Sequence, residues 1–371
     1  MAQQLSLPQD RVLSIDALRG FDMFWIIGGD VFFRSLLGLS ANPVVQALER
    51  QLHHVDWHGF RFYDMIFPLF LFLVGICLPF SLTKRIERGE SKRDIFIHVL
   101  KRTALIYFLG LCYYGLFDLD FGQLRYGGVL QRIALSYFFA SVIVLSVSIR
   151  GQIAISAAIL LVYWGIVALV PAPGVAAGSM LPDVNIGAWF DNNIIPGKKN
   201  MYGLFTGDST SLFSTPTATV SAMLGVLSGH WLRSNAEMKK KAAMLALAGA
   251  VSIAAALIWG TVFPVNKFLW TSSFVLLAGG WCMIIMSLFY WIIDVKGYVR
   301  WTFPFVVIGM NALTIFVAAR FINFHDIAGI FVHGFAGHTG AWEPVVWGAS
   351  ILAVEWLLLY FLYKHKIFLR A

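Results

Sequence analysis

Residues 60–82 read FRFYDMIFPLFLFLVGICLPFSL, and no charged side chain follows Asp64 within this stretch. The hydrocarbon core of a bilayer is about 30 Å thick, and about 20 predominantly apolar residues in a helix cross it. The stretch therefore predicts a membrane-spanning helix.

The chain as a whole is also strongly apolar. Of its 371 residues 58% are hydrophobic and only 13% are charged, with a mean hydropathy of +0.73, whereas a soluble domain carries about 25% charged residues. This composition excludes disorder, a coiled coil, collagen and a secreted disulfide scaffold. We predict an all-α, polytopic integral membrane protein with about ten transmembrane helices, at residues 14–37, 60–82, 95–117, 128–148, 152–172, 213–232, 242–263, 269–293, 303–322 and 344–363.

Basic residues in the connections predict the orientation. With the N-terminus in the cytoplasm, the cytoplasmic connections hold 16 Lys and Arg residues and the outer ones hold 5. Cytoplasmic loops of membrane proteins carry such an excess, so we expect both termini in the cytoplasm. The net charge of +8 is then a topology signal and indicates no nucleic-acid partner. The first segment lacks the features of a cleaved signal peptide, so we expect it in the mature chain.

The outer connections are predicted at residues 38–59, 173–212 and 323–343, and they contain six of the nine histidines. We expect residues 1–371 to form a single transmembrane domain with these loops on one side. No internal repeat is evident in the sequence, although many transporters are built from inverted repeats.

Ionisable residues at membrane depth are costly and commonly functional. Asp16, Arg19 and Asp22 are spaced by three residues, so they share one helix face and can neutralise each other. Asp30 lies eleven residues beyond Arg19, or about 16 Å along a helix. This face is either a structural ion pair that holds helices together or a polar path across the membrane.

Further polar residues lie in or near the predicted spans and have two interpretations each. Asp64 and Asn311 either hydrogen bond a neighbouring helix or contribute to a site. Lys101 and Arg102 either extend to the inner surface or form an anion site for phosphates. Arg132 lies about one turn inside the outer edge of its span, which is deep for a surface charge.

His54 is the best candidate for a catalytic base, because a histidine with a pKa near neutrality can take a proton from an attacking amine or hydroxyl. Asp30 is the acid that the sequence predicts to orient it. A metal cluster of His53, His54 and His58 is an alternative, but it matches no strong ligand motif. The three cysteines have no metal-binding spacing, so we expect no metal.

Several motifs resemble those of the heparan-α-glucosaminide N-acetyltransferase family. Residues 11–20, RVLSIDALRG, match R-x-x-S-x-D-x-x-R-G; residues 54–59 and 64–68 match H-x-x-W-x-G and D-x-x-F-P; residues 72–75 match F-x-x-G; and residues 128–132 match G-V-L-Q-R. Residues 264–270 match P-x-N-K-x-L-W, and residues 309–311 match G-M-N. The motifs keep their order over nearly the whole chain, which within this family resembles the bacterial NagX-type membrane proteins.

The resemblance implies transfer of an acetyl group from cytoplasmic acetyl-CoA to a glucosamine-type amine on the periplasmic side of a bacterial inner membrane. The family's active-site histidine falls on His54, and its active-site asparagine falls on Asp30, so an acid replaces an amide here. Three groups of residues are implied: His54 and Asp30 as catalytic, Arg19, Lys101, Arg102 and Arg132 for CoA, and Trp57, Asp64, Asn266, Lys267 and Asn311 for substrate. Asn266 or Asn311 would supply the oxyanion hydrogen bond. The expected partners are a small amino sugar or glycan terminus, membrane lipid and a second copy in a homodimer.

Two other functions fit the same residues. An amino-sugar transporter or permease would use the polar path for solute, and a non-catalytic membrane protein would bind CoA or sugar without turnover. The sequence leaves open whether the acceptor is an amine or a hydroxyl, and whether transfer is direct or passes through acetyl-His54.

Overall fold

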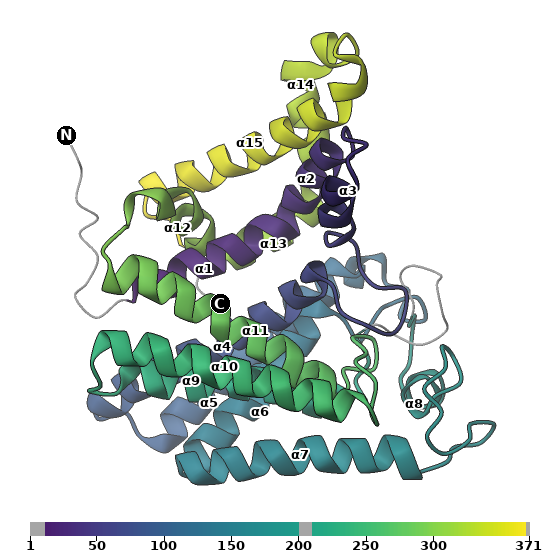
Figure 1. Ribbon diagram of the computed structural model, residues 1–371, viewed down its shortest axis with the longest axis vertical. Helices are drawn as coiled ribbons and strands as arrows, with labels where there is room; N and C mark the ends of the chain where they lie inside the picture. The colour runs from purple at the N-terminus through teal and green to yellow at the C-terminus, as the bar shows by residue number, and fades with distance from the viewer. Residues whose placement is uncertain (1–11, 200–209, 369–371) are drawn as a thin grey trace.

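The computed structural model describes residues 12–199 and 210–368, and within them the chain is helical without a β-strand. Arg11 of the first motif, residues 200–209 of the predicted loop 173–212 and the two chain ends lie outside the described residues. The long helices run side by side across Figure 1. The all-α prediction is confirmed.

Every one of the ten predicted segments is helical. Their helices are α1 (Leu13–Phe24) with η1 (Trp25–Gly29) and α2 (Asp30–Leu37), α4 (Ile66–Glu87), α5 (Lys92–Tyr113), α6 (Val129–Ser146), α7 (Ile149–Leu169), α9 (Thr215–Arg233), α10 (Met238–Gly260), α11 (Ser272–Tyr290), α12 (Phe303–Met310) with α13 (Ala312–Phe321), and α15 (Glu343–Lys364). Three shorter helices lie in the connections: α3 (Pro43–Arg50), α8 (Ile186–Ile194) and α14 (Phe324–Ala336).

Among the described residues, seven helices are long and apolar enough to cross a membrane, and the bent pair α12–α13 makes an eighth candidate. The protein is therefore a multi-pass membrane protein. The two remaining predicted segments are α1–α2, which is rich in charged residues, and α9, which is rich in Ser, Thr and Gly. Ten spans and a cytoplasmic location for both termini stay predictions.

Two of the ten predicted segments are broken helices. Between α1 and α2 the chain makes a π-helical turn in which Gly28 has a φ of 131°, a conformation that glycine adopts without steric cost. Between α12 and α13 the axis bends by 59° at Asn311. The first halves pack tightly, because a Cβ on Gly20 would lie 1.7 Å from the Phe305 carbonyl oxygen and one on Gly309 would lie 2.3 Å from that of Asp16.

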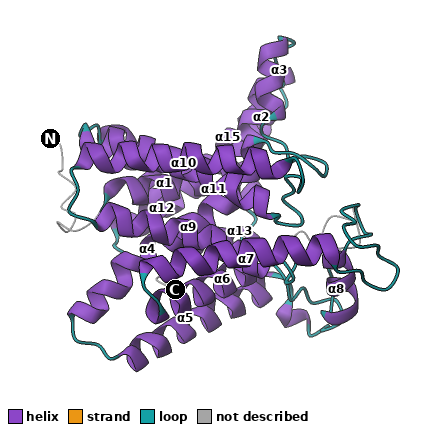
Figure 2. Cartoon of the chain, turned by 60° about the horizontal axis from the view of Figure 1, so that its bottom comes forward, coloured by secondary structure: helices purple, strands orange, loops and turns teal. Residues whose placement is uncertain are grey.

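The centre of the bundle is formed by α4 packed against α9, with α11 beside them. Glycines allow this contact: a Cβ on Gly75 would lie 1.9 Å from the Ala222 carbonyl oxygen, and one on Gly225 would lie 2.0 Å from that of Phe72. Such small residues let helix backbones approach closely in membranes, where packing rather than the hydrophobic effect drives association. In both views α2 and α3 project from the bundle, and α8 lies at its periphery (Figures 1 and 2).

We predict that Gly75→Ala destabilises the protein, because the added methyl group would overlap the backbone of α9. Overpacking of this kind costs about 1–3 kcal/mol, so the midpoint of thermal unfolding in detergent should fall clearly. Gly165→Ala on α7 is the matched control, since no heavy atom of the described residues outside the adjoining backbone of its own helix lies within 4 Å of the Cβ it would add. Equal midpoints for the two variants would contradict the close contact between α4 and α9.

Candidate active site

Two loops at the same end of the bundle build a polar cluster. The segment before α4 and the segment 261–271 before α11 are joined by a hydrogen bond from the Gly59 amide to the Val265 carbonyl oxygen at 2.9 Å. The Asn266 side chain donates to the Trp57 carbonyl oxygen at 3.0 Å and accepts from the Leu269 amide at 2.8 Å. Asn266 is fully buried, so its amide fixes the two loops relative to each other.

Asp64 is the centre of the cluster. It lies in the 3-10 turn η2 (Phe62–Met65) that leads into α4, and its side chain is completely buried. Its Oδ2 accepts from the backbone amides of Arg61 at 3.0 Å and Val55 at 3.3 Å. Since a buried carboxylate needs several donors, these bonds hold Asp64 in one orientation and leave Oδ1 for a side chain.

That side chain is His54, whose Nδ1 lies 2.7 Å from Asp64 Oδ1. Its imidazole also packs on the Tyr63 ring, with centroids 4.8 Å apart, and it remains 46% exposed. With Nδ1–H donating to the carboxylate, Nε2 carries the lone pair that accepts a proton. The arrangement is the histidine–carboxylate half of a catalytic triad.

The prediction that Asp30 orients His54 is wrong, because the carboxylate that hydrogen bonds to His54 is that of Asp64. Asp30 begins α2, and its carboxylate binds the Arg34 guanidinium at 2.8 Å, one turn along the same helix. It acts on His54 only through a weaker electrostatic interaction. The sequence placed both acids near the outer surface, but only Asp64 is brought back onto His54 by the turn at residues 61–65.

Lys267 completes the cluster. Its Nζ lies 3.0 Å from His54 Nδ1, 3.3 Å from His54 Nε2 and 3.4 Å from Asp64 Oδ1. Its side chain is 13% exposed, and burial lowers the pKa of Lys267 from 10.5 to about 8 even though Asp64 opposes the shift. The two neighbouring histidines have separate partners: His53 contacts Glu49, and His58 contacts the Asn266 amide.

A cavity of about 560 Å³ lies further along α4. Its polar lining includes Arg19, Cys77, Lys84 and Arg102, together with Asp16, which is 3.5 Å from Arg19. Arg19 also donates to the Cys77 sulfur at 3.2 Å, and Arg102 Nε is buried with no hydrogen-bond partner among the described residues. The cavity therefore offers cationic donors to an anionic ligand.

Of the four residues predicted for CoA, Arg19 and Arg102 line this cavity, and Lys101 and Arg132 do not. Lys101 is exposed. Arg132 is buried, stacks on Trp270 at 4.7 Å and donates to Ser211 and Ser214. Asn311, which the resemblance implies for the substrate and not for CoA, lies at the break between α12 and α13 and donates to the Ile367 carbonyl oxygen at 3.1 Å.

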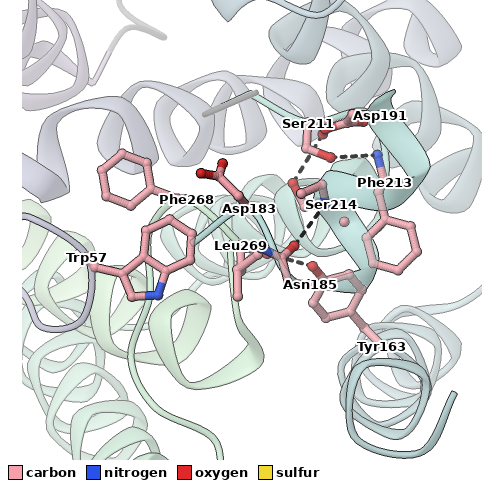
Figure 3. Close-up of a pocket in the computed structure, with 12 residues that line it drawn as sticks. Trp57, Tyr163, Asp183, Asn185, Asp191, Ser211, Phe213, Ser214, Phe268 and Leu269 are labelled. Carbon is pink, nitrogen blue, oxygen red and sulfur yellow. Dashed lines mark hydrogen bonds between the residues drawn. The ribbon is translucent and has the colours of Figure 1, made fainter. Parts of the chain in front are cut away.

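Trp57 belongs to a second, narrow pocket of about 20 Å³ (Figure 3). Its indole stacks on the Phe268 ring with centroids 5.3 Å apart and planes at 8°. Figure 3 shows these rings beside Asp183, Asn185 and Leu269. The pocket holds little more than a water molecule.

Sequence reasoning missed Cys77 and Lys84 as cavity residues and Asp64 as the partner of His54. Cys77 gave no signal because it lies within an apolar run, and Lys84 was assigned to a basic inner connection. For Asp64 a signal existed, since the motifs place it ten residues after His54, but the spacing alone does not show a contact.

Fold and site together define a multi-pass membrane protein with a histidine–aspartate pair at one end of α4 and a basic cavity further along the same helix. Comparison with known proteins shows which families and proteins the chain is similar to. Residues 11–118 match a family described as a domain of unknown function, DUF5009.

Two curated relatives are heparan-α-glucosaminide N-acetyltransferases. The human protein is 24% identical over 98% of this chain, and the mouse protein is 25% identical over 85% of it. The chain spans only about 60% of the human protein and 56% of the mouse protein. The resemblance predicted from the motifs is confirmed by these similarities.

We predict that His54 stays neutral to an unusually low pH. Burial, opposed by the hydrogen bond to Asp64, lowers the pKa of His54 below its ordinary 6.5, and the Lys267 charge acts in the same direction. Because diethyl pyrocarbonate reacts with neutral imidazole, the rate of His54 modification, followed by peptide mass spectrometry, should have its midpoint below pH 6.5. Asp64→Asn should move the midpoint lower still, since it removes the interaction that favours the imidazolium. A midpoint at or above the ordinary value in the unaltered protein would contradict this environment.

Proposed function

We propose that the protein is a transmembrane acetyltransferase that transfers an acetyl group from cytoplasmic acetyl-CoA to an amino sugar on the periplasmic side of a bacterial inner membrane. The observation that carries the proposal is the alignment on α4 of two sites, the His54–Asp64 pair and the basic cavity. The names of the curated relatives support the reaction type.

The inner cavity is the proposed donor site. Arg102 and Lys84, with Arg19, would bind the phosphates of CoA, and Arg102 Nε is a donor that the described residues leave unused. Cys77 is 13 residues beyond Asp64, or about 20 Å along the helix. The pantetheine arm of CoA is long enough to bridge such a distance, so phosphates on the inner side are compatible with a thioester near His54.

The acceptor would react at the outer end. As the amine attacks the thioester carbonyl carbon, His54 Nε2 takes the amine proton, and the C–S bond breaks to release CoA, whose thiolate is then protonated. Asp64 keeps the imidazole in the tautomer that this step requires. Asp30, Trp57, Asn266 and Asn311 remain proposed site residues, and Asn266 acts through the position of the loop that carries Lys267. A homodimer and bound lipid stay predictions from the resemblance.

His54→Ala should abolish acetylation of glucosamine by the purified protein in detergent or liposomes. A positioned general base contributes about 10²–10⁴ in rate, so the turnover should fall by at least about a hundredfold while the thermal midpoint stays near that of the unaltered protein. Full activity in the folded variant would overturn His54 as the base. Uptake of labelled amino sugar into vesicles without acetyl-CoA would instead support the transporter.

The donor site can be tested without turnover. Cys77 lines the cavity and is partly exposed, whereas Cys112 and Cys282 are buried, so N-ethylmaleimide should label Cys77 selectively in the folded protein. Saturating acetyl-CoA, which has no free thiol to consume the maleimide, should slow this labelling severalfold, and the protection should need more acetyl-CoA in the Arg102→Met variant. Equal labelling rates with and without acetyl-CoA would place the donor elsewhere.

A further inference from the structure

Lys267 contacts both members of the His54–Asp64 pair, and its ion pair with Asp64 is 3.4 Å long. Asp64 already receives three hydrogen bonds, from His54 and from the backbone amides of Arg61 and Val55. The Lys267 Nζ lies 3.4 Å from this carboxylate but 3.0 Å from the nearer nitrogen of His54. Charge-assisted N–H···O bonds are about 2.7–2.9 Å long, so the contact with Asp64 is long for such a bond, and an ammonium group has further N–H donors to offer.

The contact distances show how the ammonium lies relative to His54. The Nδ1–H group points at Asp64, so Nδ1 cannot accept from Lys267. Because Nζ is nearly equidistant from Nδ1 and Nε2, at 3.0 Å and 3.3 Å, it lies against the face of the ring and not in line with the Nε2 lone pair, which stays available to a substrate. Nε2 is also the atom that takes the acceptor's proton in the proposed reaction. A substrate that hydrogen bonds to Nε2 therefore lies beside Nζ, in reach of both groups.

We propose that Lys267 is a catalytic residue whose ammonium group stabilises the oxyanion formed at the thioester carbonyl during acetyl transfer. This inference rests on the proposed function. As the acceptor nitrogen bonds to the carbonyl carbon, its proton passes to His54 Nε2 and the carbonyl electron pair moves onto oxygen, next to Lys267 Nζ. The pair returns when the C–S bond breaks and CoA leaves as the thiolate, so Lys267 keeps its protons throughout.

A cation here serves the base as well. The positive charge of Lys267 disfavours the imidazolium form of His54 in the resting site, so the base is neutral before the reaction. When the oxyanion forms, its negative charge offsets the ammonium, and His54 can then hold the transferred proton between Asp64 and the reacting centre. Lys267 thus opposes protonation of His54 before acetyl transfer and permits it once the oxyanion has formed.

Charge-conserving and charge-removing variants test the role. Loss of one oxyanion donor typically costs about 10²–10³ in kcat, so Lys267→Met should lower kcat by this factor, with the acetyl-CoA KM changed by less than about threefold, the pattern of an interaction made only in the transition state. Lys267→Arg keeps the charge and should retain substantially more activity than Lys267→Met. Lys240→Met, at an exposed position on α10, is the matched control and should leave kcat unchanged.

The pH profile gives a second readout. Among the described residues, the titratable groups in contact with Lys267 are His54 and Asp64, with Asp30 acting on His54 from further away. Since the pKa of Lys267 is lowered to about 8, kcat should fall as the pH rises through about 8 and the ammonium is lost. In Lys267→Arg this alkaline limb should move to higher pH, because a guanidinium stays charged.

The outcomes separate this inference from the proposed function. If His54→Ala is inactive but folded Lys267→Met retains kcat within threefold, or the alkaline limb is unchanged in Lys267→Arg, Lys267 is structural and the inference fails. Acetylation of Lys267 itself as a kinetically competent intermediate, detected by mass spectrometry, would make it a nucleophile and also overturn the role. If the unaltered protein binds no acetyl-CoA and acetylates no amine, the proposed function fails instead.

Discussion

Unsatisfied backbone amides and carbonyls are costly in hydrocarbon, and this constraint shapes the whole molecule. It forces each spanning segment to be helical and permits a break only where protein or a cavity replaces lipid. The break at Asn311 obeys it, because Gly309, Met310, Ala312 and Leu313 on either side line the basic cavity. The broken helix and the cavity are therefore one feature: the chain is irregular where a ligand site is hollowed out.

The helix α4 connects the two ends of this arrangement. Its glycine-mediated contact with α9 fixes it in the bundle, and the turn that precedes it carries Asp64. Cys77 and Lys84, further along the same helix, belong to the cavity. A rigid element thus sets the distance between the proposed donor site and the proposed base, which a reaction across a membrane requires, and no moving part needs to carry the acetyl group.

Hydropathy predicted the helices well because the cost of exposing polar backbone to lipid acts on each segment separately. The site was predicted less completely, because it depends on which of several acids reaches His54. Asp30 and Asp64 both follow from the sequence as acids near the outer surface. The choice between them comes from the turn at residues 61–65 and from the backbone amides of Val55 and Arg61, which bind Asp64. The resemblance implied a CoA role for Arg132, but this residue packs against Trp270 and the loop before α9.

The pairing of Asp30 with Arg34 also explains how this chain accommodates an acid where the resemblance places an asparagine. An uncompensated carboxylate near His54 would favour the imidazolium and oppose its use as a neutral base. The Arg34 guanidinium, one helical turn away, binds the Asp30 carboxylate directly, so the added negative charge is largely neutralised where it arises. The charges that act most strongly on His54 are then Asp64 and Lys267, one of each sign, with Asp30 the weaker contributor, and the departure at position 30 leaves the proposed chemistry of the base intact.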